Sequence, residues 1–197
     1  MRSSDSIGME KGAGIVVRPY HESWPIEFER VRQELARALP PWIISVNHVG
    51  STSVPGLDAK PIIDILVAVP DLADALELVP MLESLGFEYR PKDDLPDRHY
   101  FPRTVAGLRL HHVSLAEPGS RYFRNTQIFC DALRADSAIA REYASLKRRL
   151  AAEVGTIRLA YLNGKTDFVQ GVLAANGGEV GSPLLMNPKC AGEFLLL

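Results

Sequence analysis

The stretch that decides the fold runs from His48 to Asp64 and reads HVGSTSVPGLDAKPIID. It leads from a β-branched run through the small residues 50–53 into the apolar run 62–69. An apolar run of this kind predicts a strand covered on both faces, in which Asp64 is a polar exception. A strand that ends in Gly-Ser exposes backbone N–H groups and hydroxyls with little steric cover. A phosphate group requires such an arrangement, because the donors must approach its oxygens closely.

The rest of the chain supplies helices and further strands around this stretch. Periodicity and breakers predict helices at 23–39, 71–85, 120–134, 137–153 and 158–174, and strands at 43–49, 62–69, 87–89, 99–101 and 108–115. Pro80 must kink or divide the second helix, because it removes a backbone donor, and Asp136 is positioned to cap the fourth. Strands and helices are mixed at first and only helices follow, which predicts an α+β fold with a C-terminal helical part.

Length, charge and cysteine content limit the classes of protein to which the chain can belong. The chain has 197 residues, with 22 Lys and Arg against 24 Asp and Glu and a formal net charge of −2. This length fits one domain of roughly 100–200 residues, and the charge balance disfavours nucleic-acid or membrane-surface partners. No apolar run approaches the roughly 18 residues of a membrane span, and the first residues lack the apolar core of a secretory signal. Cys130 and Cys190 are too few and too isolated for a disulfide framework or a thiolate zinc site. We therefore expect a cytoplasmic protein, and its oligomeric state stays open.

Residues around the decisive stretch suggest how a phosphate could be held. Lys60 could add a point charge to the loop, and Asp64 could hold a divalent cation that bridges phosphate oxygens. The structural alternative is a plain Gly-Ser turn and a hydrogen-bonded strand aspartate, and on spacing alone it is favoured.

The strand predicted at 108–115 contributes a second group of polar residues. Its alternation places His112 and Ser114 on one face and His111 on the other, and we expect His112 to enter the pocket. Arg134 is interpreted as pairing with Asp131 on a helix surface rather than facing the sheet.

Several other basic residues could contribute to the site, and some of them also have an ordinary structural explanation. Arg98 and Arg109 flank the histidine strand and could clamp a phosphate or carboxylate. Lys165 lies on an otherwise apolar helical face and either reaches solvent or points into a polar cavity. His48 could face the pocket or bond to the backbone. The basic run 147–149 is interpreted as a solvated helix face.

Several ordered motifs make the chain resemble one family. The run HVGSTSVPGLDAKPIIDILV resembles the hallmark of the GrpB family, also called UPF0157, which is assigned to the nucleotidyltransferase superfamily typified by DNA polymerase β. The segments VVRPYHESWPIEFERV, LHHVSLAEPGS, IFCDALRADSAIAREYASLKRRLA and AYLNGKTDFVQGVLA also match. The resemblance implies a GrpB-like domain at 15–175, a flexible N-terminal segment at 1–14 and a C-terminal tail at 176–197.

The resemblance also implies a fold and a site. The fold is a mixed sheet with flanking helices, on which Gly50 and Ser51 match the Gly-Ser pair of a phosphate-binding loop that continues through Thr52 and Ser53. The superfamily holds two metal ions with two carboxylates one residue apart and a third on a later strand. Asp64 matches the second carboxylate, but the first position is Ile62 and the third region carries His112. The implied cofactor is a divalent cation, Mg or Mn, at a depleted site of Asp64 and His112.

Three functional hypotheses follow from the resemblance. In the first, the protein binds or acts on a phosphate-bearing small molecule or nucleotide, as a nucleotidyltransferase-like transferase if it is active. In the second, it is a non-catalytic nucleotide-binding or CoA-related module. In the third, the pocket carries out metal-free acid–base chemistry on a small anionic substrate, with His112 as the base and Lys60 or Arg98 orienting the substrate.

Overall fold

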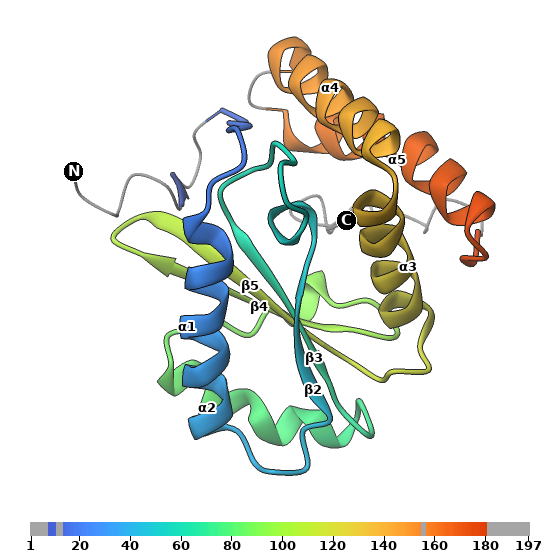
Figure 1. Cartoon of the computed structure of the whole chain (residues 1–197). Helices are drawn as coiled ribbons and strands as arrows, with labels where there is room; N and C mark the ends of the chain where they lie inside the picture. Colours follow the sequence, from blue (N-terminus) through green and yellow to red (C-terminus); the bar gives the residue numbers. More distant parts are fainter. Residues whose placement is uncertain (1–7, 11–13, 155–156, 181–197) are drawn as a thin grey trace.

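A mixed β-sheet forms the centre of the molecule (Figure 1). The computed structural model describes residues 8–10, 14–154 and 157–180. The strands are β1 (Met9–Glu10), β2 (Ser45–Val49), β3 (Ile63–Ala68), β4 (His99–Val105) and β5 (Leu108–Ala116). They follow the order β1-β5-β3-β2, and β4 also pairs with β5. β3 and β5 run parallel, whereas the other pairs are antiparallel, so the expected mixed sheet is confirmed.

Helices cover both faces of this sheet. On one face, α1 (Ser23–Ala38) and α2 (Val79–Ser84) pack on the apolar residues of β3 and β5. On the other, α3 (Arg121–Ala135) packs on the sheet, and α4 (Ser137–Val154) and α5 (Arg158–Ala175) pack on α3 and on each other (Figure 1). The two faces are called the α1 face and the α3 face below.

Alternation along the strands divides the polar residues between the two faces. On β3, Ile63, Ile65 and Val67 belong to the core beneath α1, whereas Leu66 packs with Cys130 of α3. Because successive side chains point to opposite faces, Asp64 lies on the α3 face with Leu66.

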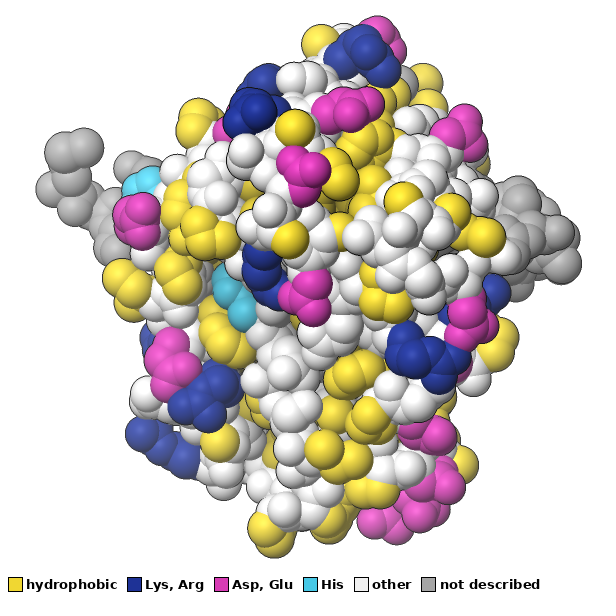
Figure 2. Space-filling model, turned by 45° about the vertical axis from the view of Figure 1, so that its right-hand side comes forward, with side chains coloured by type: hydrophobic (Ala, Val, Ile, Leu, Met, Phe, Trp, Pro, Cys, Tyr) yellow, Lys and Arg dark blue, Asp and Glu magenta, His cyan; other side chains and the backbone are white. Residues whose placement is uncertain are grey.

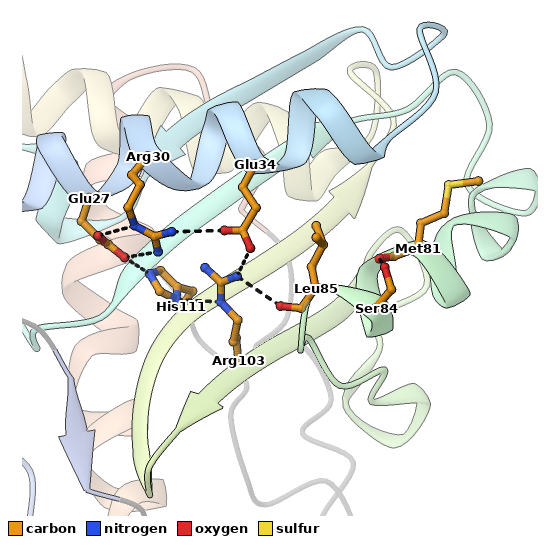
Figure 3. Close-up of polar contacts among 8 residues, drawn as sticks. All are labelled: Glu27, Arg30, Glu34, Met81, Ser84, Leu85, Arg103 and His111. Atoms are coloured by element: carbon orange, nitrogen blue, oxygen red, sulfur yellow. Dashed lines mark hydrogen bonds and ion pairs between the residues drawn. The ribbon is translucent and has the colours of Figure 1, made fainter.

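A charged network lies beneath α1 (Figure 3). His111 Nε2 bonds to Glu27 Oε1 at 2.8 Å, and Arg103 Nε donates to His111 Nδ1 at 3.1 Å. Arg103 also donates to Glu34 at 2.9 Å, and Arg30 joins Glu27 at 2.6 Å. Burial favours the neutral form of Glu27, but the hydrogen bonds from Arg30 and His111 outweigh it and lower the pKa of Glu27 to about 2. The network therefore joins α1 to β4 and β5.

Most predicted elements are present, with local differences. Asp136 caps α4 by accepting hydrogen bonds from the amides of Ala138 and Ile139 at 2.7 and 3.3 Å. The helix predicted at 71–85 is divided into a 3₁₀ turn, η3 (Asp74–Leu78), and α2, whose first turn contains Pro80. The predicted strand at 87–89 is wrong, because Phe87 forms only an isolated bridge to Arg103, although the amides of Glu88 and Arg90 also donate to the carbonyls of Pro102 and Tyr100 on β4.

The two ends of the chain are described only in part. Within the predicted N-terminal segment 1–14, Met9 and Glu10 pair with Arg109 and Leu108 of β5, and residues 1–7 and 11–13 lie outside the described residues. Of the predicted tail, residues 181–197 also lie outside them. Over the described ranges, no helix has both the length and the apolar character needed to cross a membrane.

Candidate functional site

The Gly-Ser loop connects β2 to a single 3₁₀ turn, η2 (Ser51–Ser53). Gly50 has φ +69° and ψ −175°, a conformation that is essentially restricted to glycine. A Cβ atom on Gly50 would lie 2.5 Å from Asp64 Oδ2, so the loop backbone packs directly on this carboxylate. The amide of Gly50 donates to the buried Sγ of Cys130 at 3.2 Å, which ties the loop to α3. Only glycine allows the loop this close to Asp64.

The hydroxyl groups of Thr52 and Ser53 form hydrogen bonds with residues in and beside the loop. Thr52 Oγ1 bonds to the carbonyl of Ile62 at 3.3 Å and to His48 Nε2 at 3.0 Å. Ser53 Oγ donates to the carbonyl of Gly50 at 2.7 Å and accepts from Arg134 Nη2 at 2.8 Å. These two residues, predicted as phosphate-binding, therefore shape the loop in this structure.

Arg134 has a different role from the one expected. It does pair with Asp131, at 2.8 Å, but its guanidinium also reaches Ser53 and the carbonyl of His48, the latter at 3.2 Å. The interpretation of Arg134 as confined to the helix surface is wrong, because α3 packs closely enough on β2 for this side chain to hold the loop.

Ser51 contacts a buried lysine that the sequence analysis missed. Lys147 Nζ donates to Ser51 Oγ at 2.9 Å and to the carbonyl of Asp58, and it lies 4.4 Å from the ring centroid of Tyr143. Only 2% of Lys147 is exposed, so the interpretation of residues 147–149 as a solvated face is wrong for this residue. Burial and then repulsion from Lys165 hold the pKa of Lys147 well below its usual value. Its spacing of four residues from Tyr143 was the available signal, since both fall on the buried helical face.

Asp64 and His112 converge beside the loop, as expected. They are direct neighbours in the parallel register of β3 and β5, and His112 Nδ1 lies 2.8 Å from Asp64 Oδ1. The His112 side chain is 4% exposed and that of Asp64 18%. His112 Nε2 is buried and has no hydrogen-bond partner among the residues that the structure describes. A buried nitrogen of this kind is uncommon in proteins and can serve a ligand.

Lys60 and Lys165 meet at one aromatic ring. Their Nζ atoms lie 4.2 and 5.1 Å from the ring centroid of Tyr161, and only 6% of Lys165 is exposed. Burial lowers the pKa of Lys165 to about 8 against the opposing attraction of Asp64. Of the two alternatives for Lys165, the structure therefore supports the polar interior and not the solvent.

The other predicted basic residues are dispersed. Arg98 is buried on the α3 face, 4.8 and 5.2 Å from the rings of Tyr100 and Tyr122. Tyr122 Oη bonds in turn to Ser114 at 3.2 Å, so Arg98 joins the polar cluster beyond His112. Arg109 donates to Thr104 at 2.9 Å and is not brought to the Gly-Ser loop.

His48 lies on the α1 face. Its ring stacks on Phe28 with centroids 4.7 Å apart. Burial, together with Arg134, lowers its pKa to about 4 against the effect of Asp64. His48 was expected to face the pocket or to bond to the backbone; its ring instead bonds to the Thr52 side chain and packs on Phe28.

The residues present do not fit a two-metal centre. Within the described ranges, no group of three or more His, Cys, Asp and Glu side chains could hold a metal ion. Asp64 Oδ1 is bonded to His112, and the position of the first carboxylate carries the apolar Ile62. The remaining carboxylate lies instead in the field of the buried Lys165 ammonium, which repels cations. We therefore derive no chemistry through a metal ion.

Comparison with known proteins gives the family. A family model described as GrpB protein matches residues 14–175. The chain belongs to the GrpB family. The crystal structure of the conserved protein GrpB from Enterococcus faecalis is similar, with 33% identity and a TM-score of 0.74 over 82% of this chain and 96% of that one.

Two curated relatives of this GrpB chain carry only family-level names. The UPF0157 protein PA4798 of Pseudomonas aeruginosa is 35% identical over 91% of the chain and 74% of that protein. The UPF0157 protein YqkA of Bacillus subtilis is 33% identical over 77% of the chain, and the match spans only 44% of YqkA. These comparisons establish the GrpB family and leave its substrate to be proposed from the site.

Proposed function

We propose that this GrpB protein binds a phosphate-bearing small molecule, such as a nucleotide, at the Gly-Ser loop on the α3 face of its sheet. One observation carries the proposal: buried Lys147 bonds to Ser51 of that loop, next to a carboxylate–histidine pair with an unpartnered nitrogen. A lysine ammonium binds phosphate as a point charge, and a serine hydroxyl supplies a donor of fixed direction.

The surface charge supports a small ligand over a nucleic-acid strand. On the face shown in Figure 2, basic and acidic side chains are interspersed and form no broad patch of one sign. Lys147 and Lys165 of the site are buried, so they can attract a compact anionic group and cannot track an extended phosphate backbone.

A second candidate function is proton transfer without a metal ion. With Asp64 accepting from His112 Nδ1–H, the imidazole is held in the tautomer whose Nε2 carries a lone pair. Such a nitrogen can remove a proton from a bound substrate, and Asp64 then stabilises the imidazolium that forms. The observation that favours this activity is that no described part of the chain supplies a hydrogen-bond partner for Nε2.

A binding screen tests the proposal. ATP, GTP, CTP, UTP, coenzyme A and inorganic pyrophosphate are added separately, with and without magnesium, and the unfolding temperature is measured. At least one phosphate compound is expected to raise it, because a ligand that binds only the native state stabilises it. Ser51→Ala should reduce the shift, whereas Ser84→Ala, which changes an exposed serine bonded only to Met81, should not.

The same screen separates turnover from binding. Mass spectrometry of the mixtures detects any transferred nucleotidyl group, and its absence with a clear thermal shift supports a binding module. If no phosphate compound stabilises the wild-type protein under either condition, the proposed function is wrong.

A further inference from the structure

Ser51 stands at a sharp turn between a strand and a helical turn. β2 ends at Val49, and Gly50 adopts φ +69° before η2 begins at Ser51. A serine at a tight strand-to-helix turn presents its hydroxyl away from the sheet, and hydrolases use this placement for a nucleophilic serine. Ser51 is partly exposed, whereas Thr52 is buried. An incoming molecule therefore reaches Ser51 more readily than its neighbour.

The Ser51 hydroxyl has two partners on α4. Lys147 Nζ lies 2.9 Å from Ser51 Oγ, and the Tyr143 hydroxyl also shares a hydrogen bond with the Ser51 side chain. Both partners are buried, with Lys147 2% and Tyr143 0% exposed. Because they are four residues apart, one face of α4 brings both of them to the loop. The hydroxyl is thus held from the protein interior while the serine stays accessible.

Tyr143 does not fit the role of a base for Ser51. Burial holds the pKa of Tyr143 well above its usual value, against the effect of its hydrogen bond with Ser51. A phenol in this environment keeps its proton at neutral pH. Tyr143 can therefore position the serine hydroxyl but cannot take a proton from it, and the base must be the lysine.

The contacts of Lys147 suit a neutral amine. Besides Ser51, Lys147 contacts the carbonyl of Asp58 and the ring of Tyr143, whose centroid lies 4.4 Å from Nζ. A neutral amine can donate to the carbonyl and direct its lone pair at the Ser51 hydroxyl. Burial, and then repulsion from Lys165, lowers the pKa of Lys147 well below its usual value. Lysines that lose their charge on burial act as general bases in enzymes.

A serine paired with a neutral amine favours acyl transfer over phosphoryl transfer. Attack on a carbonyl carbon requires that the hydroxyl lose its proton, and serine–lysine pairs carry out this step in acyl-transfer enzymes. Phosphoryl transfer depends mainly on positioning and on charge neutralisation by metal ions, and the residues present do not fit a two-metal centre. A carboxylic ester is therefore the matching substrate for this pair.

We propose that Ser51 is a nucleophile, that Lys147 is its general base, and that the pair transfers the acyl group of a small carboxylic ester to water. Ser51 Oγ attacks the carbonyl carbon while its proton passes to Lys147 Nζ. The bond from this carbon to the alcohol oxygen then breaks, and the alcohol leaves with that proton. A water molecule next gives a proton to Lys147 and attacks the acyl-serine. The bond to Ser51 Oγ breaks, the serine regains the proton, and the carboxylic acid is released.

This activity is separate from the proposed phosphate binding, although both use the Gly-Ser loop. A phosphate group beside Lys147 favours the ammonium form of the amine. The lysine is thus a cation when an anionic ligand is bound and a base when it is not. Neither proposal depends on the other.

Two serine-directed reagents test the inference on the full chain. The protein is treated separately with p-nitrophenyl acetate and with an alkyl fluorophosphonate, and mass spectrometry locates the modified residue. We expect an acetyl group and a phosphonyl group on Ser51, and Ser51→Ala should lose both. Ser84→Ala is the matched control, because Ser84 is an exposed serine bonded to the carbonyl of Met81, and it should react like wild type.

Variants of Lys147 separate a base from a cation. Lys147→Met and Lys147→Arg should each slow the modification of Ser51 by about a hundredfold, because methionine has no basic group and a guanidinium keeps its proton. Arg149→Met, which changes an exposed residue of the same helix that pairs with Glu153, should react at the wild-type rate. Circular dichroism shows which variants are folded. Wild-type rates in a folded Lys147→Arg protein would overturn Lys147 as the base.

The failures of the two proposals are distinguishable. If either reagent leaves Ser51 of the wild-type protein unmodified, the acyl-transfer inference is wrong, and a thermal shift with a phosphate compound still supports the proposed function. If Ser51 is modified as expected and no phosphate compound stabilises the protein, the inference stands and the proposed function is wrong.

Discussion

Two adjacent histidines on β5 show how differently the two faces of the sheet are built. On the α1 face, both ring nitrogens of His111 have protein partners, Glu27 at 2.8 Å and Arg103 at 3.1 Å (Figure 3). On the α3 face, His112 bonds to Asp64 at 2.8 Å through Nδ1, and its Nε2 has no partner within the described ranges. The His111 ring is therefore fully bonded within the protein, although Arg103 Nη2 of the same network has no partner among the described residues, whereas the His112 ring leaves one nitrogen for something else.

The difference teaches which buried polar groups belong to the fold and which to a site. The tautomer of His111 is fixed, because Nδ1 accepts from Arg103 and Nε2 must then donate to Glu27. Its network can only stabilise the contact of α1 with the sheet. A buried nitrogen without a partner costs about 1–3 kcal/mol, and such costs are typical of functional sites.

Replacing each histidine by phenylalanine tests this comparison most strongly, because we expect the largest difference in the free energy of unfolding between these two variants. His111→Phe removes one hydrogen bond each from the charged Glu27 and Arg103, which keep Arg30 and Glu34 as partners, and should lower the free energy of unfolding by about 3 kcal/mol. His112→Phe loses one hydrogen bond and removes an unpartnered nitrogen, so we expect a loss of about 1 kcal/mol or less. Urea denaturation measures both. Equal losses would contradict the distinction between an imidazole bonded at both nitrogens and one bonded at a single nitrogen.

Alanine at Gly50 should disturb the α3 face in particular. We expect Gly50→Ala to lower the free energy of unfolding by about 2 kcal/mol or more, because a Cβ would meet Asp64 and the backbone is strained for alanine. Gly56→Ala is the matched control, since Gly56 also has a positive φ of +77° but nothing within 4 Å of its Cβ position. Similar losses in the two variants would show that contact with Asp64 is unimportant.

The pH dependence of the free energy of unfolding tests how much the buried His48 contributes to stability. Its pKa falls from 6.5 to about 4 on folding, mainly through burial. Between these values the unfolded imidazole binds a proton and the folded one does not, so stability decreases as the pH falls through this window. The contribution is about 2 kcal/mol after allowance for partial exposure. His48→Gln, followed by chemical denaturation at pH 7 and near pH 4, should have a smaller pH difference than wild type. An unchanged difference would assign the effect to other groups.

Much of the fold could be predicted because local patterns and the final packing agree. The apolar run of β3 and the helical periodicities place the elements nearly where they are. The convergence of Asp64 and His112 also followed from strand alternation together with the family resemblance. The predicted strand at 87–89 failed because its pairing with β4 is limited to an isolated bridge at Phe87 and single amide bonds from Glu88 and Arg90, and local pattern does not reveal this.

The lysines of the site show why the rest could not be predicted. Lys147 lies in a run of three basic residues that is typical of a solvated face, and only the packing of α4 against the Gly-Ser loop buries it. Arg134 likewise reaches the loop from 81 residues along the chain. Contacts of this kind depend on tertiary packing, which overrides local pattern.

Histidine resonances during a ligand titration test the central claim most directly. Ring nitrogen–proton correlation spectra are recorded as inorganic pyrophosphate is added in EDTA, with His111→Phe and His112→Phe used for assignment. We predict that the His112 signals shift in a saturable manner and that the His111 signals stay in place. Of these two histidines, only His112 has a ring nitrogen without a partner among the described residues. Saturable shifts of His111, or none for His112, would contradict the assignment of the α3 face as the binding site.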